Sequence, residues 1–359
     1  MKNIEYDLII MGATGFTGKL VVEYLIENYG VENEEFTWAI AGRDKNKLET
    51  LRSSFKYIDS NSNKIPRLVV DSHDTNSLDK MTSISRLVIS TVGPYLKFGE
   101  ALVESCVKNG THYCDLTGEV PFIRRSIDAF DIKAKKNNCR IVHSCGFDSV
   151  PSDIGVLLLQ MDSLKRFDKP CDEVNLYVRS IRGGLSGGTI DSMISIFKYM
   201  GSNPGHRKLL KSPFSLNPRE SLKNNTWQPI LKSVKWDDDI QRWLCPFIMA
   251  GFNSRIVMRT NAITDYRYGI DFKYSEVSSY KKGLSGFLKA VAMFIGLVLI
   301  QISLKVRPLL WFLRKFFLPS PGEGPSKEIR DNGFFKLDII GSMDNIKKIR
   351  FTVTGKGDP

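Results

Sequence analysis

The sequence predicts an α/β protein: an N-terminal Rossmann domain with a doubly wound parallel sheet, and a second α+β domain with an antiparallel sheet. Apolar runs of strand length recur at the spacing of βαβ units through residues 1–150, and a Gly-rich turn follows the first of them. In the second half, strand-like segments follow one another without helical patterns between them, which favours antiparallel pairing.

The predicted strands of the first domain alternate with amphipathic helical patterns. The clearest helix covers residues 98–109, where four apolar side chains share one face and Gly110 ends the pattern. Because ligands of such sheets bind at the carboxyl ends of the strands, the residues after each strand are the candidate site. The strands are predicted at residues 7–11, 36–41, 67–71, 86–91, 111–116 and 140–144.

The second domain is predicted to comprise residues 151–282 and 326–359, with an apolar and basic insertion and its linker at 283–325. Such a domain commonly supplies a substrate pocket and a dimer contact, so we expect a small or lipidic substrate and a homodimer. The polar stretch 203–239 is expected to be a long surface excursion. Strands are predicted at residues 173–180, 266–274, 334–340 and 349–354, and a helix at 189–200.

Composition narrows the class of protein. The chain has 359 residues and a net charge of +12, and its six cysteines are scattered without a CxxC pair or a histidine at metal-ligand spacing. We therefore expect neither a metal site nor a disulfide framework, and a reduced, cytosolic setting. Residues 1–6 lead directly into the first strand, which predicts no signal peptide.

The Gly-rich turn after the first strand predicts a dinucleotide site. Gly12 permits a sharp turn, Gly15 lets the backbone approach a ligand, and Gly18 lets helix and strand pack closely. Backbone N–H groups and a helix N-terminus then face a diphosphate. The alternative is a merely structural turn. The predicted cofactor contacts of this turn are Gly12, Thr14, Gly15, Phe16, Thr17 and Gly18.

The end of the second strand favours NADP(H) over NAD(H). An acidic residue there would accept hydrogen bonds from the ribose 2′-hydroxyl, but Gly42 stands at the end and Arg43 follows. A guanidinium can bind a 2′-phosphate bidentately. The alternative is that Arg43 contacts only solvent; Asp44 is expected to cap the next helix in either case. Asp71, after the third strand, is predicted either to contact the adenine end or to cap a helix.

Polar residues after the later strands are the candidate substrate and catalytic groups. Gly93 and Pro94 are predicted to form a turn around the nicotinamide ribose and diphosphate, with Tyr95 near the hydride-transfer face. The alternative is a plain turn with a packed tyrosine. The candidate acids are Asp115, Glu119 and Asp148, although Asp148 with Ser149 and Ser152 is as readily explained by N-capping of the helix near Pro151. His112 and His143 lie inside predicted strands and are expected to be core residues.

Residues 283–317 stand apart as a basic and strongly apolar stretch. Residues 281–317 contain seven Lys or Arg and no Asp or Glu, and residues 290–300 are an unbroken apolar run. Basic and apolar together favour a lipid surface over nucleic acid as partner. Pro308 divides the stretch, which favours an interfacial anchor; a buried or dimer helix and a membrane span are the alternatives.

Five blocks of the sequence stand out: residues 11–18 (MGATGFTG), 41–43 (AGR), 92–95 (VGPY), 114–119 (CDLTGE) and 146–153 (GFDSVPSD). Together they resemble the saccharopine dehydrogenase-like oxidoreductase family, the eukaryotic relatives of mycobacterial trans-acting enoyl reductases, and they appear in the family's order and spacing. The segments at 186–189 and 354–359 also match, although the family continues with a further helical segment after the motif that ends here at Pro359.

The resemblance implies a Rossmann domain, a nicotinamide cofactor in the turn at 12–18, reduction of a lipid-bound double bond in the bacterial relatives, and membrane or lipid-droplet association in the eukaryotic branch. With the residues, it leads to one main hypothesis: an NADP(H)-dependent oxidoreductase on the cytoplasmic face of a membrane or lipid droplet. The alternative hypothesis is a nucleotide-binding scaffold at a lipid surface that does not turn over a substrate.

Overall fold

The computed structural model describes residues 3–184, 186–202, 204–220, 226–316, 318–320, 322–344 and 347–358. The chain divides into two compact units. Unit 1 comprises Met1–Gly146, Ser186–Tyr199 and Pro319–Gly324; unit 2 comprises Phe147–Leu185, Met200–Leu318 and Pro325–Pro359. The segment Ser186–Tyr199, which the sequence analysis assigns to the second domain, thus belongs with the first unit.

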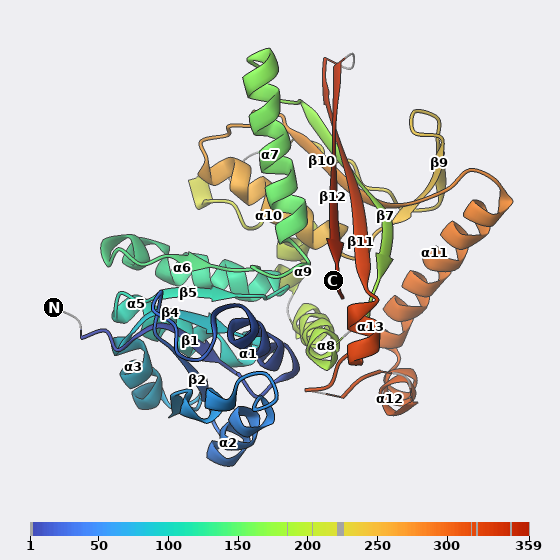
Figure 1. The fold of residues 1–359 in the computed structure, drawn as a ribbon. Coiled ribbons are helices and arrows are strands. Elements are labelled where there is room, and N and C mark those ends of the chain that lie inside the picture. The colour runs from blue at the N-terminus through green and yellow to red at the C-terminus, as the bar shows by residue number, and fades with distance from the viewer. Residues whose placement is uncertain are drawn as a thin grey trace. The chain divides into compact units, whose positions relative to one another are not determined.

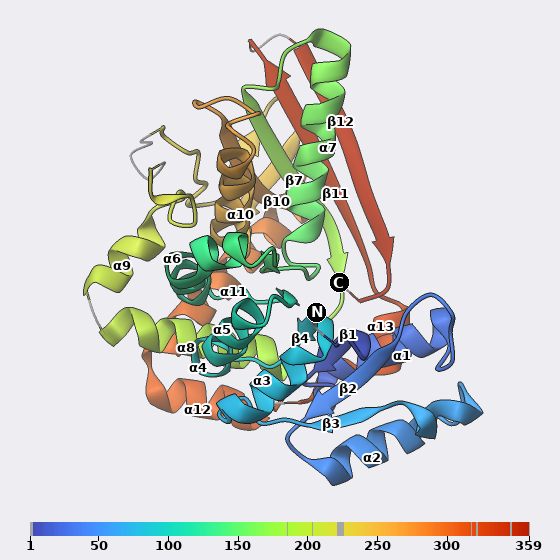
Figure 2. The same cartoon turned by 90° about the vertical axis from the view of Figure 1, so that its left-hand side faces the viewer.

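Unit 1 is built on a six-stranded, fully parallel sheet (Figures 1 and 2). The strand order is β3-β2-β1-β4-β5-β6. Strands are added to one side of β1 up to β3 and to its other side from β4 on, as in other Rossmann folds. The predicted doubly wound parallel sheet is therefore confirmed. The strands are β1 (Tyr6–Met11), β2 (Trp38–Gly42), β3 (Arg67–Val69), β4 (Ser85–Ser90), β5 (His112–Asp115) and β6 (Ile141–Val142).

The helices of unit 1 bury their apolar stripes against this sheet. Side chains of α1 (Phe16–Tyr29) and α2 (Lys45–Ser54) share one cluster with β1 and β2, in which Ile10, Ile40 and Leu48 are fully buried. Towards the other edge, α3 packs on α5, and α5 on α6, beside β4 and β5. The remaining elements are η1 (Ser60–Lys64), α3 (Thr75–Ser83), α4 (Tyr95–Phe98), α5 (Glu100–Lys108), α6 (Val120–Lys136) and most of α8 (Gly187–Ser202).

Unit 2 contains a six-stranded mixed sheet in the order β12-β11-β7-β10-β9-β8. Four of its five strand pairs are antiparallel, as predicted, but β7 and β10 run parallel. The reason lies in the long connection from β7 to β8, which returns the chain to the end of the sheet where β7 begins. From there β8, β9 and, after α10 (Ala250–Ile263), β10 alternate in direction, so β10 runs parallel to β7. The strands are β7 (Glu173–Arg182), β8 (Lys235–Asp237), β9 (Arg242–Pro246), β10 (Lys273–Tyr280), β11 (Phe334–Met343) and β12 (Lys347–Lys356).

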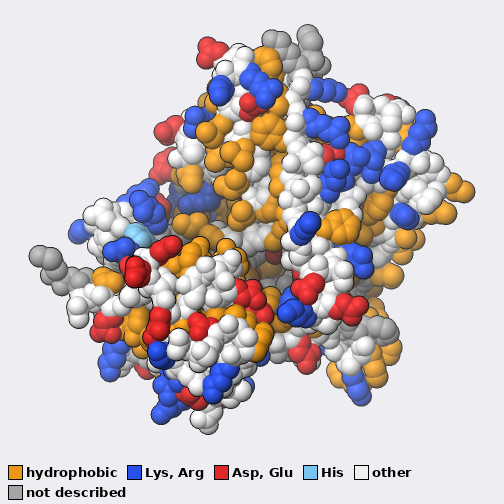
Figure 3. All heavy atoms as spheres, viewed as in Figure 1, with side chains coloured by type: hydrophobic (Ala, Val, Ile, Leu, Met, Phe, Trp, Pro, Cys, Tyr) orange, Lys and Arg blue, Asp and Glu red, His pale blue; other side chains and the backbone are white. Residues whose placement is uncertain are grey.

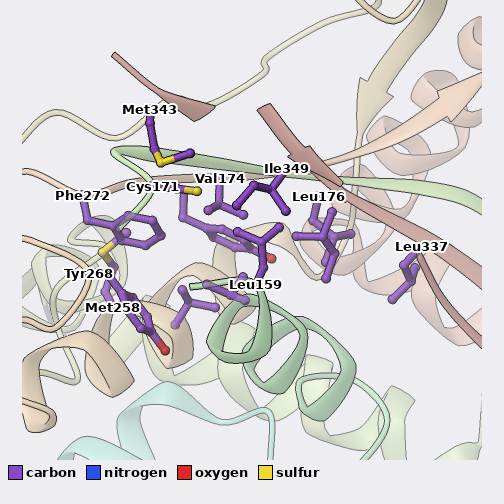
Figure 4. Close-up of a cluster of buried hydrophobic side chains, with 14 of the residues drawn as sticks. Leu159, Cys171, Val174, Leu176, Met258, Tyr268, Phe272, Leu337, Met343 and Ile349 are labelled. Carbon is purple, nitrogen blue, oxygen red and sulfur yellow. The ribbon is translucent and has the colours of Figure 1, made fainter. Parts of the chain in front are cut away.

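One face of this sheet forms the core of unit 2 with α7 (Val150–Phe167) and α10. Alternate side chains of β7, namely Val174, Leu176 and Val178, point into this cluster, as expected from the two-residue period of a strand. Figure 4 shows Leu159 of α7 among the side chains of β7 and β11. Tyr177 lies on the opposite face of the sheet, in a smaller cluster with Leu244 and Val277.

Two expectations for this region were wrong. The alternating pattern at 266–274 is a turn rather than a strand, because Tyr266 and Gly269 have positive φ angles and Tyr268 and Phe272 enter the core from the turn. The strand β10 begins only at Lys273. The stretch 203–239, expected to be a long surface excursion, contains α9 (Pro204–Lys211) and β8, and its Phe214 and Leu216 are buried. Residues 203 and 221–225 lie outside the described residues.

The apolar insertion folds as two helices, α11 (Leu284–Lys305) and α12 (Arg307–Phe316), followed after the linker by α13 (Lys327–Asp331). Pro308 does mark the break between them. The helix α11, with 22 residues, is long and apolar enough to cross a membrane. The mean hydropathy of its most apolar window is 2.2, and only 11% of that window is buried. A helix so little buried is not a core helix of this chain.

Candidate cofactor and substrate site

The Gly-rich turn has the geometry of a ligand cradle. Gly12 follows β1 with φ +88°, and a Cβ there would lie 2.7 Å from Val92 Cγ2. A Cβ on Gly18 would lie 2.2 Å from the backbone oxygen of Gly12, so this position also requires glycine. A Cβ on Gly15, by contrast, would have a single neighbour within 4 Å among the described residues, that same oxygen, at 3.3 Å. The turn is therefore closed on its protein side and open at Gly15, as dinucleotide binding requires.

The other residues of the turn complete this cradle. Gly15 is the N-cap of α1 and provides no side-chain cap. Thr14 Oγ1 lies 3.9 Å from the position of a Cβ on Gly42 at the end of β2, and Thr17 is half-buried in the first turn of α1. The ring of Phe16 packs on the backbone of Gly324, also in unit 1. The side chain of Phe16 therefore has a packing role. The cofactor contact predicted for Phe16 would come from its backbone.

Arg43 is exposed directly after β2, and none of the described residues forms an ion pair with it. Asp44 is the N-cap of α2, as predicted: its Oδ1 accepts the N–H of Asn46 at 2.9 Å and of Lys47 at 3.0 Å. Asp71 forms the turn before α3, with Oδ1 accepting the N–H of His73 at 2.9 Å, while Asp74 caps that helix. The end of β2 thus presents a cation and no available carboxylate.

The turn after β4 is fixed by hydrogen bonds to one buried carboxylate, that of Glu119. Glu119, fully buried, accepts the N–H of Tyr95 at 2.9 Å and that of Leu96 at 2.8 Å. Ser192 of α8 donates its hydroxyl to the same carboxylate at 2.8 Å. Burial raises the pKa of Glu119, although these hydrogen bonds oppose the shift. Glu119 therefore fixes the Gly93–Pro94 turn, whose peptide bond is cis, against α8.

Tyr95 is itself buried beneath this turn. Its hydroxyl donates to the backbone oxygen of Ser90 at 3.0 Å, and its ring stacks on Phe122 with 5.7 Å between centroids. Burial raises the pKa of the phenol well above its usual range. The hydroxyl is thus already bound within the protein, which corresponds to the packed-tyrosine alternative.

Asp115 is the centre of a second buried network. Its Oδ1 accepts the N–H groups of Thr117 and Ser144, both at 3.0 Å. Its Oδ2 accepts the hydroxyl of Tyr113 at 2.9 Å and contacts His143 Nδ1 at 2.7 Å. This carboxylate fastens the ends of β5 and β6 to each other. The expectation that His143 is a core residue is confirmed, because its side chain is only 8% exposed.

Asp148 belongs to unit 2 and is exposed just before α7. The serines named with it do not cap that helix through their side chains. Ser149 donates to Asn253 Oδ1 at 3.0 Å, and Ser152 donates to Glu276 Oε1 at 3.3 Å. The catalytic assignments of Tyr95, Asp115, Glu119 and Asp148 stay predictions. Two residues of these networks were not predicted from the sequence: Ser192, the partner of Glu119, and the buried Glu276.

The fold and this turn define a class: a Rossmann-fold protein with a dinucleotide cradle after its first strand. Residues 8–142 match the family model of the saccharopine dehydrogenase NADP binding domain, which supports NADP(H) as cofactor. No group of three or more His, Cys, Asp or Glu in the described part of the chain could hold a metal ion.

Similar proteins narrow the class to a family. The chain is 34% identical over 362 residues to a Mycobacterium tuberculosis protein provisionally named a trans-acting enoyl reductase, covering 99% of this chain and 85% of the relative. It is 32% identical over 357 residues to the trans-acting enoyl reductase of Mycobacterium bovis, covering 97% and 84%. The structure of saccharopine dehydrogenase (L-Glu forming) from Saccharomyces cerevisiae matches 98% of this chain and 86% of that chain with 12% identity and a TM-score of 0.47. The chain belongs to the saccharopine dehydrogenase-like oxidoreductase family that includes the mycobacterial trans-acting enoyl reductases.

Proposed function

We propose that the protein is an NADPH-dependent reductase that reduces a carbon–carbon double bond of a lipidic substrate. The observation that carries this proposal is the cradle at Gly12, Gly15 and Gly18, with the exposed and unpaired Arg43 beside it. Relatives that cover almost the whole chain are named enoyl reductases, which supports this reaction class. When bound, NADPH supplies a hydride to one carbon of the double bond, and a proton completes the other carbon.

The chain's own residues would then bind and orient the reactants. The backbone of the turn at 12–18 would hold the diphosphate, and Arg43 would hold the 2′-phosphate. Glu119 would keep the turn after β4 in place through its hydrogen bonds to Tyr95 and Leu96. The role of Glu119 is a positioning one, because both of its oxygens are bound within the protein.

The preference for NADPH is tested by titrating the purified protein with NADPH and with NADH, and binding is measured by the fluorescence of the nucleotide. Arg43→Gln should weaken NADPH binding about tenfold to a hundredfold, since charge-assisted hydrogen bonds contribute ~1.5–3 kcal/mol. NADH binding should change little. Lys45→Gln, which removes a neighbouring exposed charge, is the matched control. Tighter binding of NADH than of NADPH by the wild type would contradict the preference, and binding of neither nucleotide would contradict the whole proposal.

We also propose that α11 and α12, which make up most of residues 283–317, attach the protein to a lipid surface at the cytoplasmic face of a membrane or lipid droplet. Leu288, Ile295 and Leu299 of α11 are each more than half exposed. A monomer in water rarely exposes so long an apolar face. On α12, Trp311 is 61% exposed and Lys315 Nζ lies 5.0 Å from its ring centroid, a combination suited to an interface with head groups.

An aromatic groove at the start of α11 supports the same proposal. It has a volume of about 770 Å³ and lies between the β8–β9 hairpin and the first turn of the helix. Trp243 packs between Trp236, at 5.2 Å, and Phe287, at 4.8 Å between ring centroids, with Lys282 at the rim. Tryptophan beside lysine at the end of an apolar helix is the usual composition of a membrane–water interface.

Vesicle flotation tests this attachment. The triple variant Leu288→Ser, Ile295→Ser and Leu299→Ser should lose most of its binding to phospholipid vesicles, because each replaced side chain contributes about 1.5–3 kcal/mol when buried in lipid. Ile132→Ser on α6, which is 83% exposed, is the control. Both variants should keep NADPH binding. Equal flotation of the triple variant and the wild type would contradict the proposed surface.

The second candidate function is a nucleotide-binding scaffold at a lipid surface without turnover. It is favoured by the observation that the oxygens of Tyr95, Asp115 and Glu119 are all engaged inside unit 1. Oxidation of NADPH in the presence of an α,β-unsaturated acyl thioester, measured with vesicles present, separates the two functions. Nucleotide binding without oxidation across a panel of chain lengths would favour the scaffold.

A further inference from the structure

The outer face of the sheet in unit 2, opposite to the α7–α10 core, carries a cluster of three arginines around one carboxylate. Arg179 of β7, Arg242 of β9 and Arg350 of β12 surround Asp338 of β11; we call these four residues the arginine cluster. The strands run in the order β12-β11-β7-β10-β9, so the cluster extends across most of the sheet.

The carboxylate of the cluster is fully occupied. Asp338 is 1% exposed, and its Oδ2 accepts from Arg179 Nη1 and from Arg350 Nη2, both at 2.6 Å. Its Oδ1 accepts the hydroxyl of Thr352 at 2.8 Å. Burial acts to raise the pKa of Asp338, but the hydrogen bonds from Arg350 and Thr352 and the nearby charges lower it overall. One anionic charge thus offsets three cationic ones, and the cluster keeps a net charge of +2.

Arg242 lacks the partner that the other two arginines have. Its Nη2 donates to the backbone oxygen of Ser279 at 3.3 Å, but its Nε is buried and has no acceptor among the described residues. Burial and the charges of Arg179 and Arg350 lower the pKa of Arg242, against the opposing effect of Asp338. A buried donor without an acceptor beside two like charges destabilises the protein unless an anion completes the group.

The cluster is open to solvent on one side. The side chain of Arg350 is 57% exposed and that of Arg179 is 23% exposed, so a ligand can reach both guanidinium groups. Figure 3 shows Lys and Arg side chains gathered beside β11 and β12, where this face is in view. The planar fork of arginine suits the oxygens of a phosphate group more than a point charge would.

We propose that Arg179, Arg242 and Arg350 bind a phosphate group, with the Nε–H of Arg242 donating to one of its oxygens. A phosphate dianion matches the net charge of +2, whereas a single carboxylate would leave one positive charge over. The phosphate can come from a soluble phosphomonoester or from the phosphomonoester head group of phosphatidic acid. The site is independent of the cofactor turn.

The test compares phosphate binding by the full chain and by Arg242→Gln. Arg242 is the informative position because, unlike Arg179 and Arg350, it forms no ion pair with the buried Asp338. Lys165→Gln, on α7 at the opposite face of the sheet, removes the same charge from an exposed site and is the control. Binding of inorganic phosphate and of glycerol 3-phosphate is measured by calorimetry at constant ionic strength, and binding of phosphatidic acid and phosphatidylcholine vesicles by flotation.

We expect Arg242→Gln to weaken phosphate binding about tenfold, which corresponds to ~1.4 kcal/mol, and Lys165→Gln to leave it unchanged. If glycerol 3-phosphate binds as tightly as phosphatidic acid vesicles do, the ligand is a soluble phosphate ester. If only phosphatidic acid vesicles bind and Arg242→Gln reduces this binding, the ligand is a lipid head group. Absence of binding in all arms, or equal binding by Arg242→Gln and Lys165→Gln, would overturn the proposal.

A second measurement on the wild type covers the case in which Arg242→Gln does not fold. Phenylglyoxal modifies accessible arginines, and mass spectrometry of peptides identifies each modified site. Inorganic phosphate should slow modification of Arg350 in the cluster and leave Arg166 of α7, whose side chain is 60% exposed, less affected. Equal rates for Arg350 with and without phosphate would contradict the site.

Discussion

Replacing two glycines of the same turn by alanine is expected to have two different effects: Gly15→Ala should weaken cofactor binding, and Gly18→Ala should lower stability. At Gly18, inside α1, the new Cβ would lie 2.2 Å from Gly12 O and 2.8 Å from Ala13 Cα. Both neighbours are backbone atoms, so α1 must move away from the turn. Overpacking of this kind costs ~1–3 kcal/mol. At ~2–4 °C per kcal/mol for a domain of this size, Gly18→Ala should lower the melting temperature by roughly 2–12 °C.

At Gly15 the same methyl group meets a different surrounding. The backbone there has φ −74° and ψ 169°, which alanine adopts without strain, and the nearest atom is Gly12 O at 3.3 Å. Loss of unfolded-state entropy stabilises such a substitution by ~0.4–1 kcal/mol, which offsets the tight contact. Gly15→Ala should therefore melt within about 3 °C of the wild type. The methyl group would stand where the diphosphate approaches, so NADPH affinity should fall at least about tenfold, or ~1.4 kcal/mol.

Differential scanning fluorimetry without nucleotide and fluorescence titration with NADPH separate these two effects. The turn is a cofactor cradle if Gly15→Ala keeps its melting temperature and loses NADPH. Wild-type NADPH affinity in Gly15→Ala would refute this reasoning, because the only open side of the turn would then face no ligand. An unchanged melting temperature in Gly18→Ala would refute the proposed close approach of helix and strand.

Three further predictions concern buried and reactive groups. Burial raises the pKa of Glu276 from 4.5 to about 7, so the stability that this group contributes is complete below about pH 4.5 and is lost as the pH rises through about 7. In urea unfolding, the free energy of unfolding of Glu276→Gln should therefore rise relative to that of the wild type by up to ~3 kcal/mol between about pH 5 and pH 8. Asp115→Asn should reduce the free energy of unfolding by ~3–5 kcal/mol, measured by urea titration against the exposed control Asp131→Asn. The thiols of Cys114 and Cys145 are neighbours, because Cys145 raises the pKa of Cys114 and Cys114 lowers that of Cys145. Diamide should therefore join them with loss of two hydrogens in the intact mass, and Cys145→Ser should abolish the change.

The parts of the fold that could be predicted from the sequence depend on local patterns. Each strand of unit 1 is an apolar run near its observed position, and the turn at Gly12 lies within a single stretch of chain. The end of β2 is equally local, since Asp44 caps α2 from the position next to Arg43. Such features need no knowledge of distant partners, which is why the class of fold and the cofactor turn were accessible.

Features that depend on distant partners or on unusual backbone could not be predicted. The bond between Ser192 and Glu119 joins positions 73 residues apart, and nothing local marks Ser192 as its partner. The hairpin between β8 and β9 turns through Gln241, whose φ of +53° is the left-handed region normally signalled by glycine. Asp237 stabilises that turn by accepting the N–H groups of Asp239 and Ile240. Without a glycine, the acidic run was interpreted as a surface excursion.

The buried networks also limit which groups can serve as proton donor in the proposed reaction. A general acid needs an O–H or N–H directed at the substrate. The hydroxyl of Tyr95 is directed at Ser90 O, and the oxygens of Asp115 and Glu119 already accept hydrogen bonds from backbone N–H groups of the protein. Protonation of Glu119 would turn an acceptor into a donor against Leu96 N–H and would loosen the turn after β4. Within unit 1 these three side chains are therefore better suited to position the cofactor turn than to protonate a substrate, and the proton donor is to be sought among groups whose hydroxyl or imidazole is not already bound.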